Sequence, residues 1–224
     1  FAVIMGMFFL LLFNYVFGGA IGAGTGVDYI QFLVPGVFVI TALQGAQQTS
    51  TGLAQDLSEG VISRFRSLPM NQVAVIAGRT VADAGRNVIG VLLVAGVGYL
   101  MGFRFASIGG AVAAIALTIG IGYAFSWLGA AIAAKLRNPE MVGMLSMFWL
   151  FPLMMASSAF TPTATMPKWL KAFADNQPIS VASDAVRALV DGRPAGSDSL
   201  YALIWMVVLL AIFIPLTTRL YRKV

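Results

Sequence analysis

The sequence contains no cysteine and no histidine, and charged residues are scarce. Without cysteine the chain forms neither a disulfide nor a thiolate metal site, and without histidine it lacks a common ligand of zinc and haem and the commonest general base. We therefore expect no metal in this chain. Charged residues amount to 10% of the 224, against about 25% in a typical soluble domain. Hydrophobic residues make up 59%, and the mean hydropathy of +0.87 places the chain among membrane proteins.

The sequence also lacks the loop G-x-x-x-x-G-K-[ST] that cradles nucleotide phosphates, and it contains no Gly-Lys pair. Its apolar segments do not hold the clustered carboxylates that catalysis in a membrane enzyme would need. We therefore expect the chain not to be an enzyme. If ATP drives its action, another polypeptide must hydrolyse the ATP.

What the sequence does contain is a series of long apolar runs, each near the roughly 20 residues that a helix needs to cross a bilayer. Six such runs cover 1–18, 32–53, 73–103, 108–134, 141–160 and 200–218. The pattern predicts an all-α membrane protein with six transmembrane helices, which form one domain over residues 1–224. Because the first run begins at Phe1 with no polar residues before it, we expect upstream residues to be missing.

The lysine and arginine residues predict how these helices are oriented. If the six helices cross in alternation, one side holds Arg64, Arg66, Arg79, Lys135, Arg137, Arg219, Arg222 and Lys223. The short loops of the opposite side hold only Arg104. Basic residues are enriched on the cytoplasmic side, so both termini are predicted to be cytoplasmic and the connection 161–199 to face outward. The same bias explains the net charge of +5 without a nucleic-acid partner.

The polar segment 55–70 has the pattern of a short amphipathic helix. Its apolar residues recur at steps of three and four, at Leu57, Val61, Phe65 and Leu68. Pro69 then stops the helix, because proline disfavours helix at the residue before it. Two interpretations remain open. The helix lies on the membrane surface with its arginines among lipid headgroups, or it fills a groove on a cytoplasmic partner.

The second apolar run carries a stripe of polar side chains on one helical face, formed by Thr41, Gln44, Gln48 and Thr51. Polar groups are not satisfied in hydrocarbon, so the stripe is predicted to face inward, toward a transport pathway or a partner subunit. The alternative is hydrogen bonding between helices with no role in transport.

The third run carries Arg79, Asp83 and Arg86 at spacings that place them on one helical face. A proton relay is one interpretation, because ionisable groups inside membranes are functional candidates. However, the two arginines favour the charged carboxylate and make Asp83 a poor proton carrier. We therefore expect a structural brace near the cytoplasmic surface, with snorkelling arginines and a spacing that allows ion pairs on one face.

The outward connection contains two short helical patterns, one opened by Pro167 and one marked by apolar residues from Ile179 to Val190. Each is too short to span, so a re-entrant or interfacial hairpin is expected. Trp169 is typical of the headgroup level of a bilayer. The hairpin is either an outer lid over a pathway or a passive cap that anchors the fifth and sixth helices.

Three segments together resemble the permeases of ABC-2 type transporters. They are Glu59-Gly60 followed by Arg64-Phe65-Arg66-Ser67-Leu68-Pro69-Met70, the run from Tyr29 to Gly36, and the stretch from Met166-Pro167-Lys168-Trp169-Leu170 to Asn176-Gln177-Pro178-Ile179-Ser180. Their order and spacing agree with the family over the chain from Tyr29 to its end. The sequence is most similar to the daunorubicin/doxorubicin-resistance exporter subgroup of actinobacteria.

The resemblance implies a multi-pass protein of the bacterial inner membrane, which pairs with a second copy or a related permease and with two cytoplasmic ABC ATPase subunits. These ATPases would bind ATP and Mg, and this chain would carry no cofactor. The ATPase-coupling helix would comprise Leu57, Glu59, Gly60, Val61, Arg64, Phe65, Arg66, Leu68 and Pro69. The outer lid would include Pro167, Trp169, Gln177 and Pro178. The interfacial helix that precedes the first span in the family is absent, which we attribute to a truncated start.

We therefore predict an ATP-driven exporter permease for hydrophobic or amphipathic cargo, a drug or a lipid, with surrounding membrane lipids as further partners. A polysaccharide or polyol exporter is the alternative within the same architecture. An ion-coupled secondary transporter would need a titratable or ion-binding site near the middle of the bilayer. Asp83 is badly placed for that role.

Overall fold

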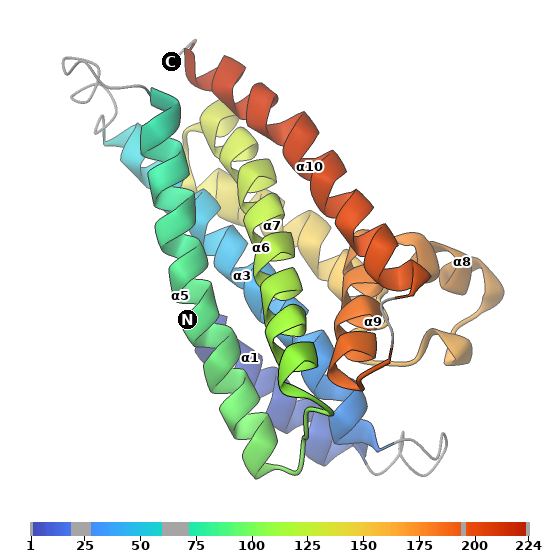
Figure 1. Ribbon diagram of the computed structural model, residues 1–224. Helices are drawn as coiled ribbons and strands as arrows, with labels where there is room; N and C mark the ends of the chain where they lie inside the picture. The colour runs from blue at the N-terminus through green and yellow to red at the C-terminus, as the bar shows by residue number, and fades with distance from the viewer. Residues whose placement is uncertain (1, 19–27, 60–71, 194–195, 223–224) are drawn as a thin grey trace.

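The structure, a computed structural model, describes residues 2–18, 28–59, 72–193 and 196–222, and every regular element in these ranges is helical (Figure 1). In chain order the elements are α1 (Ala2–Leu12) with a π-helical continuation η1 (Phe13–Phe17), α3 (Tyr29–Ser58), α5 (Gln72–Leu100), α6 (Ile108–Leu136), α7 (Pro139–Met155), the 3-10 turn η2 (Thr163–Thr165), α8 (Lys168–Asn176), α9 (Pro178–Val190) and α10 (Ser197–Arg222). The all-α prediction is confirmed.

Four of the described helices are long and apolar enough to cross a membrane: Tyr29–Ser58, Gly78–Leu100, Ile108–Leu136 and Ser197–Tyr221. Two predicted spans, the first and the fifth, correspond to shorter apolar helices, Ile4–Phe17 and Pro139–Met155. A helix of 17 residues is about 26 Å long at 1.5 Å per residue, slightly below the roughly 30 Å of a bilayer's hydrocarbon core.

Two predicted helix ends were wrong. The third helix was predicted to reach Phe103, but α5 ends at Leu100 because Gly102 adopts a φ of 109°, which stops the helix. The fifth was predicted to reach Phe160, but α7 ends at Met155. There the Ser157 hydroxyl donates to the Met154 carbonyl at 2.6 Å, which satisfies a helix-end carbonyl and turns the chain away.

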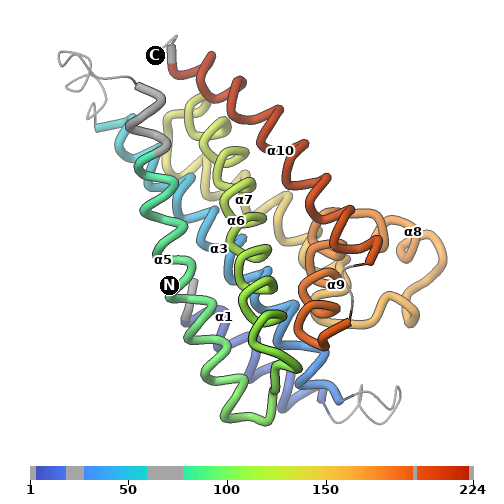
Figure 2. Tube along the Cα trace, in the orientation of Figure 1, coloured from blue at the N-terminus to red at the C-terminus, as the bar shows by residue number. Residues whose placement is uncertain are grey.

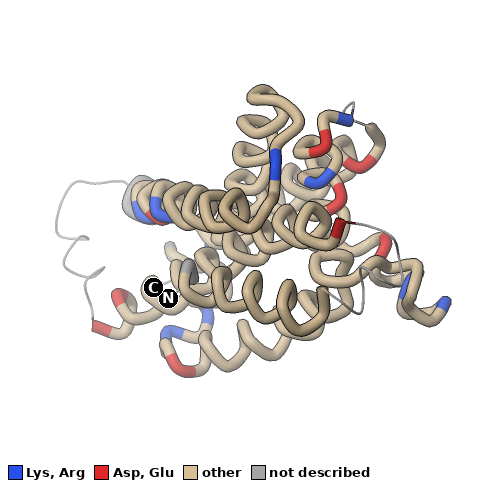
Figure 3. Tube along the Cα trace, turned by 90° about the horizontal axis from the view of Figure 1, so that it is seen from below, with Lys and Arg blue, Asp and Glu red and all other residues tan. Residues whose placement is uncertain are grey.

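The long helices run alternately up and down the bundle, and α3 lies at its centre, packed against α1, α5, α6, α7 and α9 (Figure 1). We call the two ends of the bundle the Ser58 end and the Tyr29 end, after the last and first residues of α3. Helix α10 finishes at the Ser58 end (Figure 2), where α5 begins (Figure 1). Most of each long helix lacks charged residues, which gather toward helix ends and in the connection before α10 (Figure 3).

The contact between α3 and α6 depends on small residues. A Cβ atom at Gly122 would lie 2.9 Å from the Ala42 Cβ, and one at Gly129 would overlap the Ser50 hydroxyl. Small residues let helix backbones approach closely, which is the usual basis of helix association in membranes. The outward faces of α5, α7 and α10 are instead covered by large apolar side chains, including Leu92, Phe148 and Val207, as a lipid-facing surface requires.

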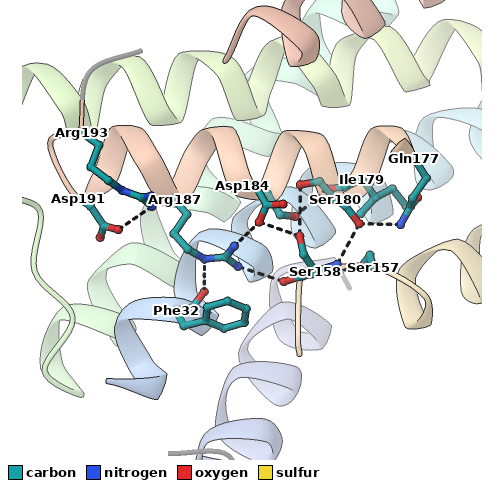
Figure 4. Close-up of polar contacts among 12 residues, drawn as sticks. Phe32, Ser157, Ser158, Gln177, Ile179, Ser180, Asp184, Arg187, Asp191 and Arg193 are labelled. Carbon is teal, nitrogen blue, oxygen red and sulfur yellow. Dashed lines mark hydrogen bonds and ion pairs between the residues drawn. The ribbon is translucent and has the colours of Figure 1, made fainter. Parts of the chain in front are cut away.

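Residues 156–162 and α9 close the Tyr29 end of the bundle, and we call them together the cap (Figure 4). Arg187 lies at its centre and is 8% exposed. Its guanidinium donates to the carbonyl oxygens of Phe32 and Ser158, at 3.2 and 3.1 Å, and forms an ion pair with Asp184. It also lies 3.7 Å from the centroid of the Phe32 ring. Arg187 therefore ties α9 to α3 and to the chain after α7.

Further hydrogen bonds connect the same segments. The Ser158 hydroxyl donates to Asp184 at 2.9 Å, and the Ser158 amide donates to the Ser180 hydroxyl at 3.0 Å. The Gln177 amide donates to the Ala156 carbonyl at 3.2 Å, at the end of α7. Burial raises the pKa of the Asp184 carboxyl, while the Arg187 guanidinium opposes that rise. The cap is thus a buried polar network whose parts hold one another in place.

Replacing Arg187 by Leu should destabilise the fold, because it leaves the Ser158 carbonyl and the Asp184 carboxylate without their cationic partner. We expect a loss of about 2 kcal/mol or more. At roughly 2–4 °C per kcal/mol for a chain of this size, the unfolding midpoint in detergent should fall by about 5 °C or more. The unfolding midpoint of Arg187→Lys should lie between those of the wild type and Arg187→Leu.

The matched control is Arg193→Leu, which breaks an exposed ion pair with Asp191 a short distance along the chain. Exposed pairs contribute about 0–1 kcal/mol, so this variant should melt close to the wild type. Equal midpoints for Arg187→Leu and the wild type would contradict the assigned role of the cap network.

Candidate functional site

A groove of about 400 Å³ lies between α1, α3 and α7. Glutamine and threonine side chains of α3 line one wall: Gln44, Gln47, Gln48 and Thr51. Met5 and Phe9 of α1, and Met147, Leu150, Phe151 and Met154 of α7, form the rest. The described lining therefore combines an uncharged hydrogen-bonding wall with a flexible, polarizable apolar one. Pockets of several hundred Å³ with few polar groups are the usual form of small-molecule sites.

Three of the four predicted stripe residues, Gln44, Gln48 and Thr51, line this groove. Thr41 is not among the residues that line it. Its hydroxyl is buried beneath Gly6 of α1 and donates to the Val37 carbonyl at 2.8 Å. Gln48, in contrast, is exposed on this subunit. The difference arises because α1 covers one end of the stripe and leaves the other end open.

Gln44 is a part-buried member of the groove wall. Its side-chain oxygen is buried and has no hydrogen-bond partner within the described part of the chain. A buried acceptor left unsatisfied costs about 1–3 kcal/mol. Gln44 therefore contributes to the groove wall a buried oxygen that the described part of the chain leaves unsatisfied.

Most of the predicted ATPase-coupling helix, from Gly60 to Pro69, lies outside the described residues. Of its predicted members the structure describes Leu57 and Glu59. Leu57 belongs to the last turn of α3 and packs against the cluster that contains Trp127 and Tyr221, so it does not begin a separate helix as predicted. Glu59 is exposed and accepts a hydrogen bond from Gln55 at 2.8 Å.

The predicted charge brace has a different set of partners. Asp83 is 7% exposed and pairs with Arg86, as expected. Arg79 pairs with Asp56 of α3, although its spacing from Asp83 also allowed a pair on one helical face. The sequence argument considered spacing along one helix and did not consider the acid that the neighbouring helix brings opposite Arg79.

The four predicted lid residues occupy both ends of α8. Pro167 precedes the first residue of α8, and Trp169 is 75% exposed on its surface. Gln177 is buried between α8 and α9 and bonds to the end of α7, while Pro178 is the first residue of α9. Sequence reasoning missed Arg187 and Asp184. The available signal was an Asp and an Arg three residues apart within an apolar helix pattern.

Sequence comparisons identify related transport proteins. The profile of the ABC-2 type transporter family matches residues 1–190. The daunorubicin resistance ABC transporter permease protein DrrB1 of Streptomyces coeruleorubidus is 39% identical over 222 residues, which cover 99% of this chain and 78% of that protein. The probable doxorubicin resistance ABC transporter permease protein DrrC of Mycobacterium tuberculosis is 24% identical over 217 residues, covering 91% of this chain and 74% of that protein.

A putative transport permease, ycf38, of Cyanophora paradoxa is 23% identical over 165 residues, covering 72% of this chain and 56% of that protein. The family profile spans most of the chain, and the relationship to the Streptomyces permease extends over nearly all of it. The resemblance found in the sequence is therefore confirmed, and this chain belongs to the ABC-2 type transporter family as a membrane permease of the drug-resistance exporter type.

Proposed function

We propose that this chain is the permease subunit of an ATP-driven exporter, and that hydrophobic or amphipathic cargo leaves the cytoplasm or the inner leaflet through the groove between α1, α3 and α7. The observation that carries the proposal is the lining of that groove, with amides on one wall and methionine and phenylalanine on the other. Such a surface accepts the apolar body of an amphiphile and bonds its polar groups.

The proposed topology has six spans, both termini in the cytoplasm, and the Ser58 end facing the bacterial cytoplasm. The two shorter apolar helices, α1 and α7, cross with the four long ones. The distribution of lysine and arginine supports this orientation. The cap and α8 then face outward, and the hairpin of α8 and α9 serves as the outer lid of the pathway. The exposed Trp169 suits the headgroup level of the outer leaflet.

The exposed parts of the groove support a dimer. Gln48 is exposed on the isolated subunit, and an amide facing lipid would be left without hydrogen-bond partners. Beside it, α7 presents the large apolar groove residues Met147 and Phe151. We infer that a second copy of this chain, or a related permease, covers this face and completes the pathway. Two cytoplasmic ABC ATPases, which bind ATP and Mg, drive the assembly.

The lining favours this cargo class over the alternatives. A polysaccharide needs many hydrogen-bonding groups, whereas six of the ten lining residues are apolar. An ion-coupled transporter needs a titratable group on the pathway, whereas Asp83 lies outside the groove and pairs with Arg86. The names of two relatives, which refer to daunorubicin and doxorubicin resistance, are consistent with a drug-like amphiphile. A lipid has the same general chemistry.

Phe151→Ala should weaken transport, because Phe151 lines the groove and offers an aromatic face to the cargo. Aromatic contacts of this kind contribute about 0.5–1.5 kcal/mol, so the rate at low cargo concentration should fall roughly two- to tenfold. The measurement is ATP-dependent daunorubicin uptake into inside-out vesicles. Phe148→Ala is the matched control, since Phe148 lies on the same helix and is absent from the groove lining. Equal losses in both variants would argue against the groove as the cargo route.

Phe65→Asp should abolish binding of the ATPase while leaving the membrane helices intact, because it places a charge on the apolar ridge of the predicted coupling helix. The measurement is co-purification from detergent of this chain with the ABC ATPase encoded beside it. Phe173→Asp places the same charge on an exposed phenylalanine of α8 and should retain the ATPase. If the wild-type chain binds no ATPase under any condition, the exporter proposal is wrong.

A further inference from the structure

Helices α3 and α5, which flank the predicted coupling segment, meet along a polar seam that the proposed function leaves unused. The seam comprises Ala42, Gly45, Thr49, Gly52 and Asp56 of α3, and Arg79, Asp83 and Asn87 of α5. Its members recur at steps of three and four on both helices, so the seam follows one continuous line of contact. It begins in the last turns of α3 and reaches the level of the groove.

The ion pair between Asp56 and Arg79 closes the end of the seam nearest the coupling segment. Both side chains are about one-third exposed. Arg79 reaches Asp56 by crossing α3 at Gly52, where a Cβ atom would come within 2.5 Å of the guanidinium. The absence of a side chain at position 52 therefore creates the notch through which Arg79 joins the two helices.

A second notch lies two turns farther along α3. Asn87 occupies the space left by Gly45, where a Cβ atom would overlap the Asn87 amide, and it donates to the Ala42 carbonyl at 3.4 Å. Between the two notches is a small polar cavity of about 60 Å³. It is lined by Gly45, Gln48, Thr49, Arg79, Asp83, Arg86 and Asn87.

Arg79 and Asn87 each oppose sliding of one helix along the other, because sliding would have to move both side chains out of their notches. Packed elements of this kind have discrete arrangements and do not deform continuously. Gln48 lines both the seam cavity and the groove. The helix that is locked at the seam is therefore also the helix whose side chains form the polar wall of the groove.

We propose that Asp56 and Arg79 are positioning residues that make α3 and α5 move as one rigid unit. A displacement of the segment between these helices then reaches the groove through α3 and is not lost by sliding at the seam. This inference rests on the proposed function and adds to it the residues that couple ATP hydrolysis to movement of the cargo. Asp56 and Arg79 touch neither cargo nor nucleotide in this role.

The test is a double-mutant cycle with Asp56→Asn, Arg79→Gln and the double variant, each purified with the ATPase and reconstituted in proteoliposomes. The readout is daunorubicin moved per ATP hydrolysed. We expect each single variant to lower this ratio about fivefold or more, the range typical of coupling between distant sites. The double variant should be no worse than either single variant, because the two residues act through one contact. Arg79→Lys, which keeps the charge, should retain most of the coupling.

A purely structural role predicts different results. If the variants lose coupling only in proportion to lost ATPase binding or lost thermal stability, the proposal is wrong. It is equally wrong if the ratio is unchanged, or if the two single losses multiply in the double variant. Lys171→Gln, which breaks an exposed ion pair on α8, is the control and should leave the ratio unchanged. Failure of the wild-type chain to bind an ATPase would reject both the exporter proposal and the role of Asp56 and Arg79. The outcomes described above would reject only the role of Asp56 and Arg79.

A second measurement leaves the ion pair between Asp56 and Arg79 intact. The chain has no cysteine, so a Gly45→Cys and Asn87→Cys pair introduces a single cross-link across the second notch. A Cβ atom at position 45 would touch the side chain at position 87. Two cysteines at these positions are therefore close enough for a disulfide, whose Cβ atoms lie roughly 3.5–4.5 Å apart. If α3 and α5 move as one unit, oxidation should leave transport unchanged. Loss of transport on oxidation, reversed by a reductant, would show that the helices must slide and would overturn the proposal.

Discussion

The central position of α3 depends on how its polar side chains are satisfied where water is excluded. Hydroxyl groups within the helix donate back to carbonyl oxygens of the preceding turn, among them those of Thr41, Thr49, Ser50 and Thr51. A hydroxyl that bonds within its own helix needs no partner from a neighbour. The helix therefore carries a polar sequence and still packs against five others. The longer side chains of Gln44, Gln47 and Gln48 instead open onto the groove, together with Thr51.

Composition and hydrophobic periodicity were enough to predict the helical class and the approximate extent of the long helices. Both depend on the length of apolar runs, which the bilayer dictates directly. The exact helix ends were less predictable. Gly102 ends α5 through a positive φ, and Ser157 ends α7 through a local hydrogen bond. Neither event interrupts the apolar run, so hydropathy alone gave no sign of it.

The candidate site was predictable only in part, because its features join segments that are distant in the sequence. The polar stripe of α3 followed from one helix, and three of its four residues line the groove. The partner of Arg79 and the contacts of Arg187 required knowing which helices become neighbours. Asp56 precedes Arg79 by 23 residues, and Phe32 precedes Arg187 by 155. Spacing within a single helix cannot reveal such pairs.

The two arginines hold α3 at its opposite ends in different ways. At the Tyr29 end, buried Arg187 bonds to the backbone of two segments as well as to Asp184, so that end of α3 is fixed on several sides. At the Ser58 end, Arg79 holds α3 through a part-exposed side chain, Asp56, and its own Nε is without a hydrogen-bond partner among the described residues. A helix fixed at one end responds to a push at the other by tilting. On the proposed mechanism the groove residues Gln44 to Thr51 lie between the fixed and the moving end, where such a tilt changes the width of the pathway.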